Sequence, residues 1–245
     1  MASQLGLLLF LLIVLLLTLL LHRRRPIPVL RAISAFDALP DQTGRAAESG
    51  QTLHISLGTG GIGGSDTVAS LAGLTVLSHL AEQGVATDTP PLVTVSDPTL
   101  LPLAQNVLRQ AYIRRGRRGD FRRAQVRLVA ASPMAYALGT MDILTHEPVL
   151  ANVMFGAFGP EVGLIARAGA EANLVQLSGS DDPQALSILH ASTDQVVVGE
   201  ELYATGGYLD RTAPKLASLA AEDVVRILLI LFIIFAALFR WVETL

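Results

Sequence analysis

The chain has 245 residues, a formal net charge of -3, no cysteine and 51% apolar residues. This length suffices for one well-filled domain. The lack of thiols excludes a disulfide framework and fits a reducing compartment, and the charge by itself points to no class of partner. Two terminal segments hold a large share of the apolar residues.

The first apolar segment covers residues 5–21 without a charge, close to the ~20 residues that cross a bilayer. The sequence "HRRRP" follows it and no positive charge precedes it, which reverses the pattern of a cleaved signal peptide. We therefore expect a retained transmembrane anchor within residues 1–25. Residues 26–51 are rich in Pro, Gly and polar residues without a clear period, which predicts a linker or collar.

Between the two apolar segments, short β-rich runs alternate with helical segments. The runs cover residues 53–57, 92–96, 126–130, 152–155, 174–178 and 195–198. Helix starts are marked by a capping residue followed by proline, as in Asp97-Pro98, Ser132-Pro133 and Asp182-Pro183, with Gly159-Pro160-Glu161 as a variant. The pattern predicts a mostly parallel sheet of about six strands covered by helices on both faces, over residues 52–213.

The two halves of this region repeat one order of strand, glycine-rich turn, helix, strand and Ser-Asp element. Such a repeat is the plan of a doubly wound, Rossmann-like α/β fold with strand order 3-2-1-4-5-6. We therefore expect this fold class, flanked by N- and C-terminal transmembrane helices.

The second apolar segment, residues 224–242, follows a helix that is expected to begin near residue 214. Its uninterrupted part, residues 227–239, would be about 20 Å long, so Arg226 and Arg240 would have to extend toward the two interfaces of a bilayer. Residues 214–245 are thus predicted as a helix continuing into a second span, with a buried or interfacial helix as the alternative. Arginines after the first span and before the second predict an inner-membrane protein whose domain is cytoplasmic and whose termini both lie outside.

The stretch "GTGGIG" after the first predicted strand matches the dinucleotide fingerprint G-x-G-x-x-G at Gly58, Gly60 and Gly63, with Asp97 as the candidate ribose ligand. Two features count against a nucleotide. Asp66 stands at the N-cap position, where its carboxylate would occupy the helix terminus, and Asp97 comes late for a ribose ligand. The sequence favours a structural turn without a cofactor, and a nucleotide or dinucleotide is the alternative.

Other chemistry is sparse. Asp66, Asp97, Asp181 and Asp182 are expected at the carboxyl edge of the sheet, either as helix caps or as ligands of a divalent cation. Asp142, His146 and Glu147 would form either an acid/base group or a polar helix end. No nucleophile elbow, P-loop lysine or metal-ligand spacing is found, so we predict no catalytic and no metal-binding residue.

The strongest charge feature is "RRGRRGDFRR", which with Arg109 and Arg127 falls at the amino edge of the predicted sheet. We expect both anchors to meet that edge, which would bring its arginines against the lipid bilayer. The predicted membrane-surface residues are Arg114, Arg115, Arg117, Arg118, Arg122 and Arg123. A nucleic-acid patch is less favoured, because only Tyr112 and Phe121 interleave with the arginines, and an ordinary solvated loop is the third possibility.

With "GTGGIGGSDT" after the first strand and "VSDPT" after the second, the chain resembles an uncharacterised bacterial family of membrane-anchored domains. The resemblance implies the architecture and no activity. The leading hypothesis is a doubly anchored, non-enzymatic scaffold or assembly subunit that forms a homo-oligomer and contacts other membrane proteins. The alternative is a membrane-tethered nucleotide sensor or dehydrogenase-like enzyme that uses the glycine turn.

Overall fold

The computed structural model of the protein describes residues 31–210 and 225–237. The chain divides into two compact units. Residues 32–210 form one of them, an α/β domain, and residues 225–237 are a helix that belongs to the other.

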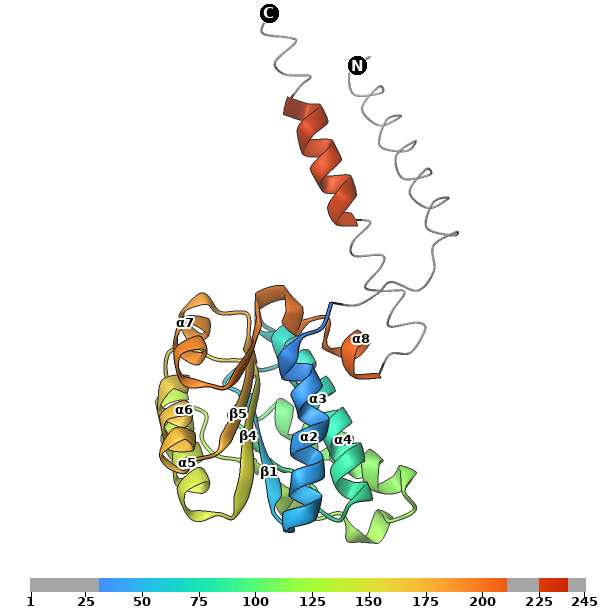
Figure 1. Ribbon diagram of the computed structural model, residues 1–245, viewed down its shortest axis with the longest axis vertical. Coiled ribbons are helices and arrows are strands. Elements are labelled where there is room, and N and C mark those ends of the chain that lie inside the picture. Colours follow the sequence, from blue (N-terminus) through green and yellow to red (C-terminus); the bar gives the residue numbers. More distant parts are fainter. Residues whose placement is uncertain (1–30, 211–224, 238–245) are drawn as a thin grey trace, which may run out of the picture. The chain divides into compact units, whose positions relative to one another are not determined.

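Six parallel strands form the sheet at the centre of the α/β domain (Figure 1). They are β1 (Thr52–Gly58), β2 (Leu92–Val95), β3 (Val126–Leu128), β4 (Val149–Ala157), β5 (Val175–Ser180) and β6 (Gln195–Val198). Their order is β3-β2-β1-β4-β5-β6, and Ile55 at the centre pairs with Val93 on one side and Val153 on the other. The predicted doubly wound order is confirmed, as are all six predicted strands.

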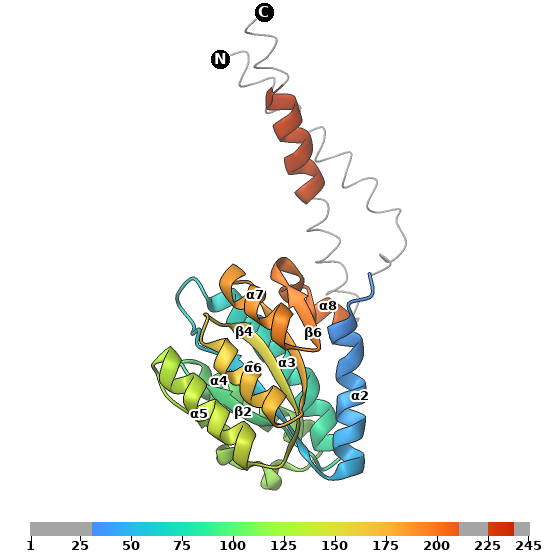
Figure 2. The same ribbon diagram turned by 60° about the vertical axis from the view of Figure 1, so that its left-hand side comes forward.

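Helices cover both faces of the sheet, as Figures 1 and 2 show from two directions. One layer contains α2 (Ser34–Ser49), α3 (Thr67–Ala86) and α4 (Leu100–Arg114), and the other contains α5 (Pro133–His146), α6 (Val162–Glu171) and α7 (Pro183–Ser192). A short helix, α8 (Thr205–Asp210), packs on α3. Ser132 and Asp182 are N-caps followed by proline, as predicted, whereas α4 begins only at Leu100, after the N-cap Thr99.

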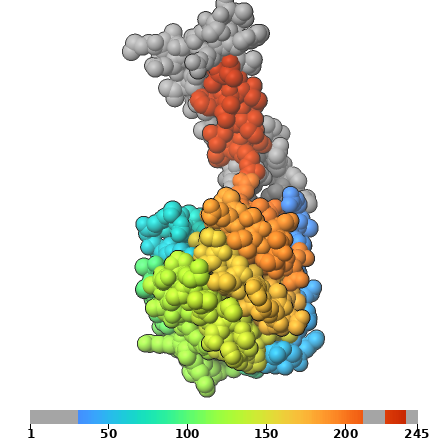
Figure 3. Space-filling view, turned by 90° about the vertical axis from the view of Figure 1, so that its left-hand side faces the viewer, coloured from blue at the N-terminus to red at the C-terminus, as the bar shows by residue number. Residues whose placement is uncertain are grey.

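The two faces of the sheet differ in polarity. Beneath α2, α3 and α4, the buried strand side chains are apolar, among them Leu53, Ile55, Val153 and Phe155, which join one core cluster. Beneath α5, α6 and α7, alternate strand positions carry buried polar side chains: His54, Ser56, Thr94, Asn152, Gln176 and Ser178. The outer surface of the layer that covers this polar face is turned toward the viewer in Figure 3.

Residues 34–49 form the helix α2, so the prediction of a linker or collar over residues 26–51 is wrong for this part. The helix buries residues at helical spacing, including Phe36, Leu39 and Ala46, against the sheet and α3. Pro40 lies inside the helix and removes one backbone donor, but burial of this apolar side compensates for the weak helix propensity. The α/β domain therefore begins before β1, at residue 32.

Helix α2 also corrects the expected course of the chain. It ends at Ser49, next to the start of β1, so its first residue, Ser34, lies toward the opposite end of the strands. Phe36 near its start contacts Phe155 near the carboxyl end of β4 and Tyr208 of α8, with ring centroids 6.0 and 5.4 Å apart. The chain therefore enters and leaves the α/β domain toward the carboxyl end of β4. The expectation that both connections lie at the amino edge, beside the arginines, is wrong.

No helix within the described ranges is long and apolar enough to cross a membrane. The predicted first span, residues 5–21, lies outside these ranges. Of the predicted second span, residues 225–237 are described, as a helix. Its large apolar side chains are exposed around the helix, from Ile227 and Leu229 to Ile233, which is 64% exposed.

Candidate functional site

The glycine turn joins β1 to α3 at the carboxyl edge of the sheet. Gly58 has a φ of +81°, and a Cβ atom there would overlap the carbonyl oxygen of Ala157 in β4. A Cβ on Gly60 would lie 2.7 Å from the Cβ of Ala157 and 3.0 Å from the Oγ of Ser70 in α3. The backbone N–H of Thr59 donates to the Ala157 carbonyl at 2.8 Å. Both fingerprint glycines thus allow β1 to approach β4 and α3 closely.

Asp97, the predicted ribose ligand, closes the turn onto the end of β2. The backbone N–H of Thr99 donates to Asp97 Oδ1 at 2.7 Å, and the Thr99 hydroxyl is bonded to the same oxygen. Thr99 in turn accepts a hydrogen bond from the backbone N–H of Ile62 at 2.9 Å. A Cβ on Gly61 would lie only 2.5 Å from Asp97 Cγ. The aspartate therefore fastens the turn to β2, and one of its carboxylate oxygens is already engaged.

The third fingerprint glycine is not needed for close packing, although its backbone N–H donates to Thr67 Oγ1 at 2.9 Å. Gly63 has a φ of +105° and is exposed, and no heavy atom lies within 4 Å of where its Cβ would be. The close approach of helix to strand falls instead to Gly73 in α3, where a Cβ would overlap the carbonyl oxygen of Phe155. Gly73 was not predicted as a packing residue, although a glycine inside a predicted helix is a signal of such packing.

Asp66 occupies the N-cap position of α3, as expected, but its side chain makes no capping hydrogen bond. It accepts instead from Ser65 Oγ at 2.7 Å, so the prediction that its carboxylate fills the helix terminus is wrong. Asp182 does cap α7, because its Oδ1 accepts from the backbone N–H groups of Gln184 and Ala185 at 2.9 and 2.8 Å.

A cleft of about 440 Å³ opens at the carboxyl edge, beside the glycine turn and the starts of α6 and α7. This is the point where the strand order reverses, the usual place for a ligand in open α/β sheets. We call this cleft the carboxylate cleft, because four carboxylates line it: Asp66, Glu161, Asp181 and Asp182. No basic side chain of the described residues lines it. The phosphates of a nucleotide would meet uncompensated negative charge here.

The carboxylates of this cleft are held by neutral donors. Glu161 accepts from the backbone N–H of Gly159 at 2.9 Å, and Asp181 accepts from the Tyr203 hydroxyl at 2.6 Å. Partial burial, together with the neighbouring Asp181 carboxylate, raises the pKa of Tyr203 to about 12. None of these bonds neutralises a carboxylate.

The structure brings together three of the four aspartates that were expected at this edge and holds Asp97 on the far side of the glycine turn. Within the described residues, no group of three or more His, Cys, Asp or Glu side chains has the arrangement of a metal site. The possible acid/base group also separates, because His146 Nδ1 lies 3.0 Å from Asp142 Oδ1 whereas Glu147 pairs with Arg127. His146 and Asp142 are 71% and 76% exposed, as at a polar helix end.

A buried chain of hydrogen bonds crosses the polar face of the sheet. Gln176 Nε2 donates to the Ala166 carbonyl at 2.8 Å, which leaves Gln176 Oε1 to accept from Asn152 Nδ2 at 3.1 Å. Asn152 Oδ1 then faces His54 Nδ1 at 2.8 Å, so this nitrogen carries the proton. His54 Nε2 is left to accept from the Thr94 hydroxyl at 3.0 Å. The backbone carbonyl of Ala166 orients the Gln176 amide in β5, and through Asn152 in β4 it therefore fixes the tautomer of His54 in β1.

The chain ends at Tyr136 of α5. Its hydroxyl lies 2.9 Å from Thr94 Oγ1 and 2.7 Å from Ser56 Oγ, and all three side chains are fully buried. Burial lowers the pKa of His54 to about 4, against a partial opposing effect of its bond to Asn152. His54 is therefore neutral at physiological pH, and the whole chain is satisfied without a charge.

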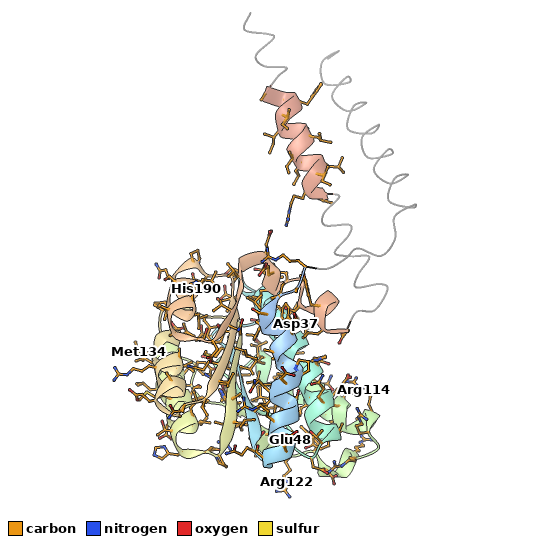
Figure 4. The ribbon with its side chains drawn as sticks, in the orientation of Figure 1. Asp37, Glu48, Arg114, Arg122, Met134 and His190 are labelled. Carbon is orange, nitrogen blue, oxygen red and sulfur yellow. The ribbon has the colours of Figure 1, made fainter. Side chains whose placement is uncertain are left out.

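The arginine loop, residues 114–123, lies between α4 and β3 at the amino edge, as predicted (Figure 4). Three arginines of this region are paired within the domain: Arg114 with Glu82, Arg117 with Asp88 and Asp120, and Arg127 with Glu147. The exposed guanidinium groups that make no ion pair with any described residue belong to Arg109, Arg115, Arg118, Arg122 and Arg123.

Neither aromatic residue of this region is freely exposed for stacking on bases, since Tyr112 is buried and Phe121 is half-buried. Tyr112 is 4% exposed, its ring centroid lies 6.0 Å from that of Phe121, and its hydroxyl accepts from Gln125 Nε2 at 2.8 Å. They anchor the loop to α4, which weakens the case for a nucleic-acid patch.

Comparison with known proteins places the whole chain in one family. A family model described as "Domain of unknown function (DUF6754)" matches residues 1–245, so the chain belongs to that family. No curated protein and no solved structure matches it.

Proposed function

Because membership of a family of unknown function brings no activity to this chain, we propose a function from its site: it is a doubly membrane-anchored, non-enzymatic scaffold or assembly subunit that associates with itself. The observation that carries the proposal is the glycine turn, where Ala157, Ser70 and Asp97 pack against the glycines. The turn holds β1, β4 and α3 in close packing. The cleft beside it is lined by carboxylates.

The helix at residues 225–237 supports the anchoring. An apolar helix with large hydrophobic side chains exposed around it needs lipid or protein as its environment. The charge-free run at residues 5–21 and the arginines that follow it support a first anchor and a cytoplasmic α/β domain.

The alternative function is a nucleotide sensor or dehydrogenase-like enzyme, which the spacing of the fingerprint glycines favours. A nucleotide-binding assay distinguishes the two functions. We expect no thermal shift of the full chain with NAD, NADP, FAD or ATP at millimolar concentration. A ligand at ~100 times its dissociation constant would stabilise the native state by about 2.7 kcal/mol, which a melting curve resolves. A saturable shift that Gly64→Val removes would establish the alternative, since Gly64 lies in the same turn, has open space around it and does not have a positive φ.

Topology tests the anchoring separately. The chain lacks cysteine, so single cysteines at Ser3, Ser49, Ser192 and Thr244 can be labelled with an impermeant maleimide in intact cells. We expect labelling at Ser3 and Thr244 and protection of the two positions of the α/β domain until the membrane is opened. Labelling of the cysteines at positions 49 and 192 in intact cells would mean that the α/β domain lies outside, which would contradict the predicted orientation.

Self-association is measured on the full chain extracted in detergent, by its mass over a dilution series. We expect a homo-oligomer, as is common for subunits that present complementary surfaces. A monomer mass at every concentration would refute the scaffold proposal.

A further inference from the structure

Charge is strongly segregated along the α/β domain. Residues 32–210 contain ten arginines and no lysine, against eighteen carboxylates. Eight of the ten arginines fall between Arg109 and Arg127, a stretch that contains only one carboxylate, Asp120. The rest of the domain is therefore strongly acidic. The arginines cluster at the amino edge of the sheet, and the carboxylate cleft lies at the carboxyl edge.

Several arginines at the amino edge form no ion pair within the described residues of the domain. Arg115, Arg118, Arg122 and Arg123 are exposed and form no ion pair with the described residues, and Arg109 bonds only to the neutral side chain of Asn106. A guanidinium presents its donors in a planar fork that matches a carboxylate. This surface is thus prepared for acidic groups that another molecule supplies.

The opposite edge supplies such groups. The carboxylates of the cleft accept hydrogen bonds from neutral donors, namely serine and tyrosine hydroxyls and backbone N–H groups. Asp66 is exposed, and Tyr203 beside Asp181 is 41% exposed. The two edges of one domain are therefore complementary in charge, and aromatic and arginine side chains are those enriched in protein interfaces.

We propose that the arginine loop docks on the carboxylate cleft of a second copy of this chain, so that copies associate head to tail. The proposal rests on the self-association proposed above and assigns surfaces to it. Because the two surfaces differ, the contact is heterologous, and repeated contacts build either a closed ring or an open chain. At physiological ionic strength charges are screened beyond about 8 Å, so these local surfaces outweigh the repulsion between two acidic domains.

Other polyanions fit this edge less well. Tyr112 is buried, and the ring of Phe121 is partly buried and packs against it. A bilayer at this edge is also not supported by the course of the chain, which enters and leaves the domain toward the other end of the strands. In Figure 4, Asp37 near the start of α2 and Arg122 mark these opposite ends.

The test reverses charge at each edge of the full chain in detergent and measures its mass by sedimentation over a dilution series. The loop variant is Arg118→Glu with Arg122→Glu, and its matched control is Arg45→Glu with Arg167→Glu, the two arginines of the α/β domain that lie outside the cluster. We expect the loop variant to need at least ~10 times more protein for association than the wild type and the control. The wild type should likewise dissociate as salt rises.

The edge variant is Asp66→Arg with Asp181→Arg, which should also lose association by itself. Mixing it with the loop variant should restore a complex that contains both, because each variant keeps one native surface. Loss of association without this rescue would overturn docking on the carboxyl edge.

The possible failures are distinguishable. A wild type that is monomeric at every concentration removes the scaffold proposal together with this one. An assembled wild type with an equally assembled loop variant removes only head-to-tail docking. If that assembled variant loses binding to phosphatidylglycerol vesicles or to duplex DNA, the loop serves that polyanion, and docking between copies is wrong.

Discussion

Lowering the pH should destabilise the α/β domain through His54. The pKa of this side chain is about 4 in the folded domain, against 6.5 for an ordinary histidine. Between these two values the unfolded chain binds a proton that the folded domain does not, so the free energy of unfolding falls as the pH is lowered from 6.5 toward 4. At 1.36 kcal/mol per pKa unit, the full loss is about 3 kcal/mol.

The charged groups nearest to His54 do not reverse this sign. Glu147 raises the pKa of His54 and Arg127 lowers it, and these two side chains pair with each other at the end of the sheet. Burial is the largest cause of the shift. Protonation of Nε2 would also break its present bond, because the Thr94 hydroxyl donates to that nitrogen and would have to reorient to accept from it.

Urea unfolding of the full chain in detergent, followed by circular dichroism, measures the effect at several pH values. His54→Gln removes the titrating group, so its curve should lose less stability than wild type between pH 6.5 and 4.5, by about 2 to 3 kcal/mol. His190→Gln, at an exposed position in α7, is the control and should follow the wild type. Parallel curves for wild type and His54→Gln would refute the assignment of a neutral, buried His54.

Three further predictions concern stability in the same assay. Gly58→Ala should cost more than about 2 kcal/mol, because its Cβ would overlap Ala157 at a positive φ, whereas Gly64→Ala, with open space around it, should change little; equal effects would contradict the packing role of the turn. Asp182→Ala should cost about 1 kcal/mol through the lost N-cap of α7, and no loss would mean that the cap is not formed. Tyr136→Phe should cost about 1 to 3 kcal/mol, because two buried hydroxyls lose a partner, and a neutral result would contradict the hydrogen-bond chain.

The strand order could be predicted because its signals are local. A β-rich run followed by a glycine turn, and a capping residue followed by proline, mark the ends of elements wherever they occur, and right-handed crossovers leave few topologies. The helix α2 was missed because Pro40 and Gly44 look like breaks in the sequence. Its stabilising contacts, from Phe36 and Leu39 to the sheet, are distant in the chain and become visible only in the fold.

The candidate site shows the same limit. The fingerprint glycines were found, but the atoms that pack against them, Ala157 above all, come from the other half of the sheet. The alternation of His54 and Ser56 with leucine and isoleucine in β1 is visible in the sequence, where it is typical of a strand with one solvent-facing side. Only the presence of α5 and α6 above that side turns these residues into a buried chain.

That buried chain determines how the second helical layer is seated, and through it the shape of the carboxylate cleft. Hydrophobic contacts alone would let α5 slide on the sheet, because they have no direction, whereas the Tyr136 hydroxyl must meet Ser56 and Thr94. Tyr136 lies one turn after Pro133, which lines the cleft, so fixing the tyrosine also fixes that wall. A sheet with one apolar and one polar face thus combines a core that stabilises α2, α3 and α4 with a layer that positions α5 and α6 at the edge where we expect the next copy to dock.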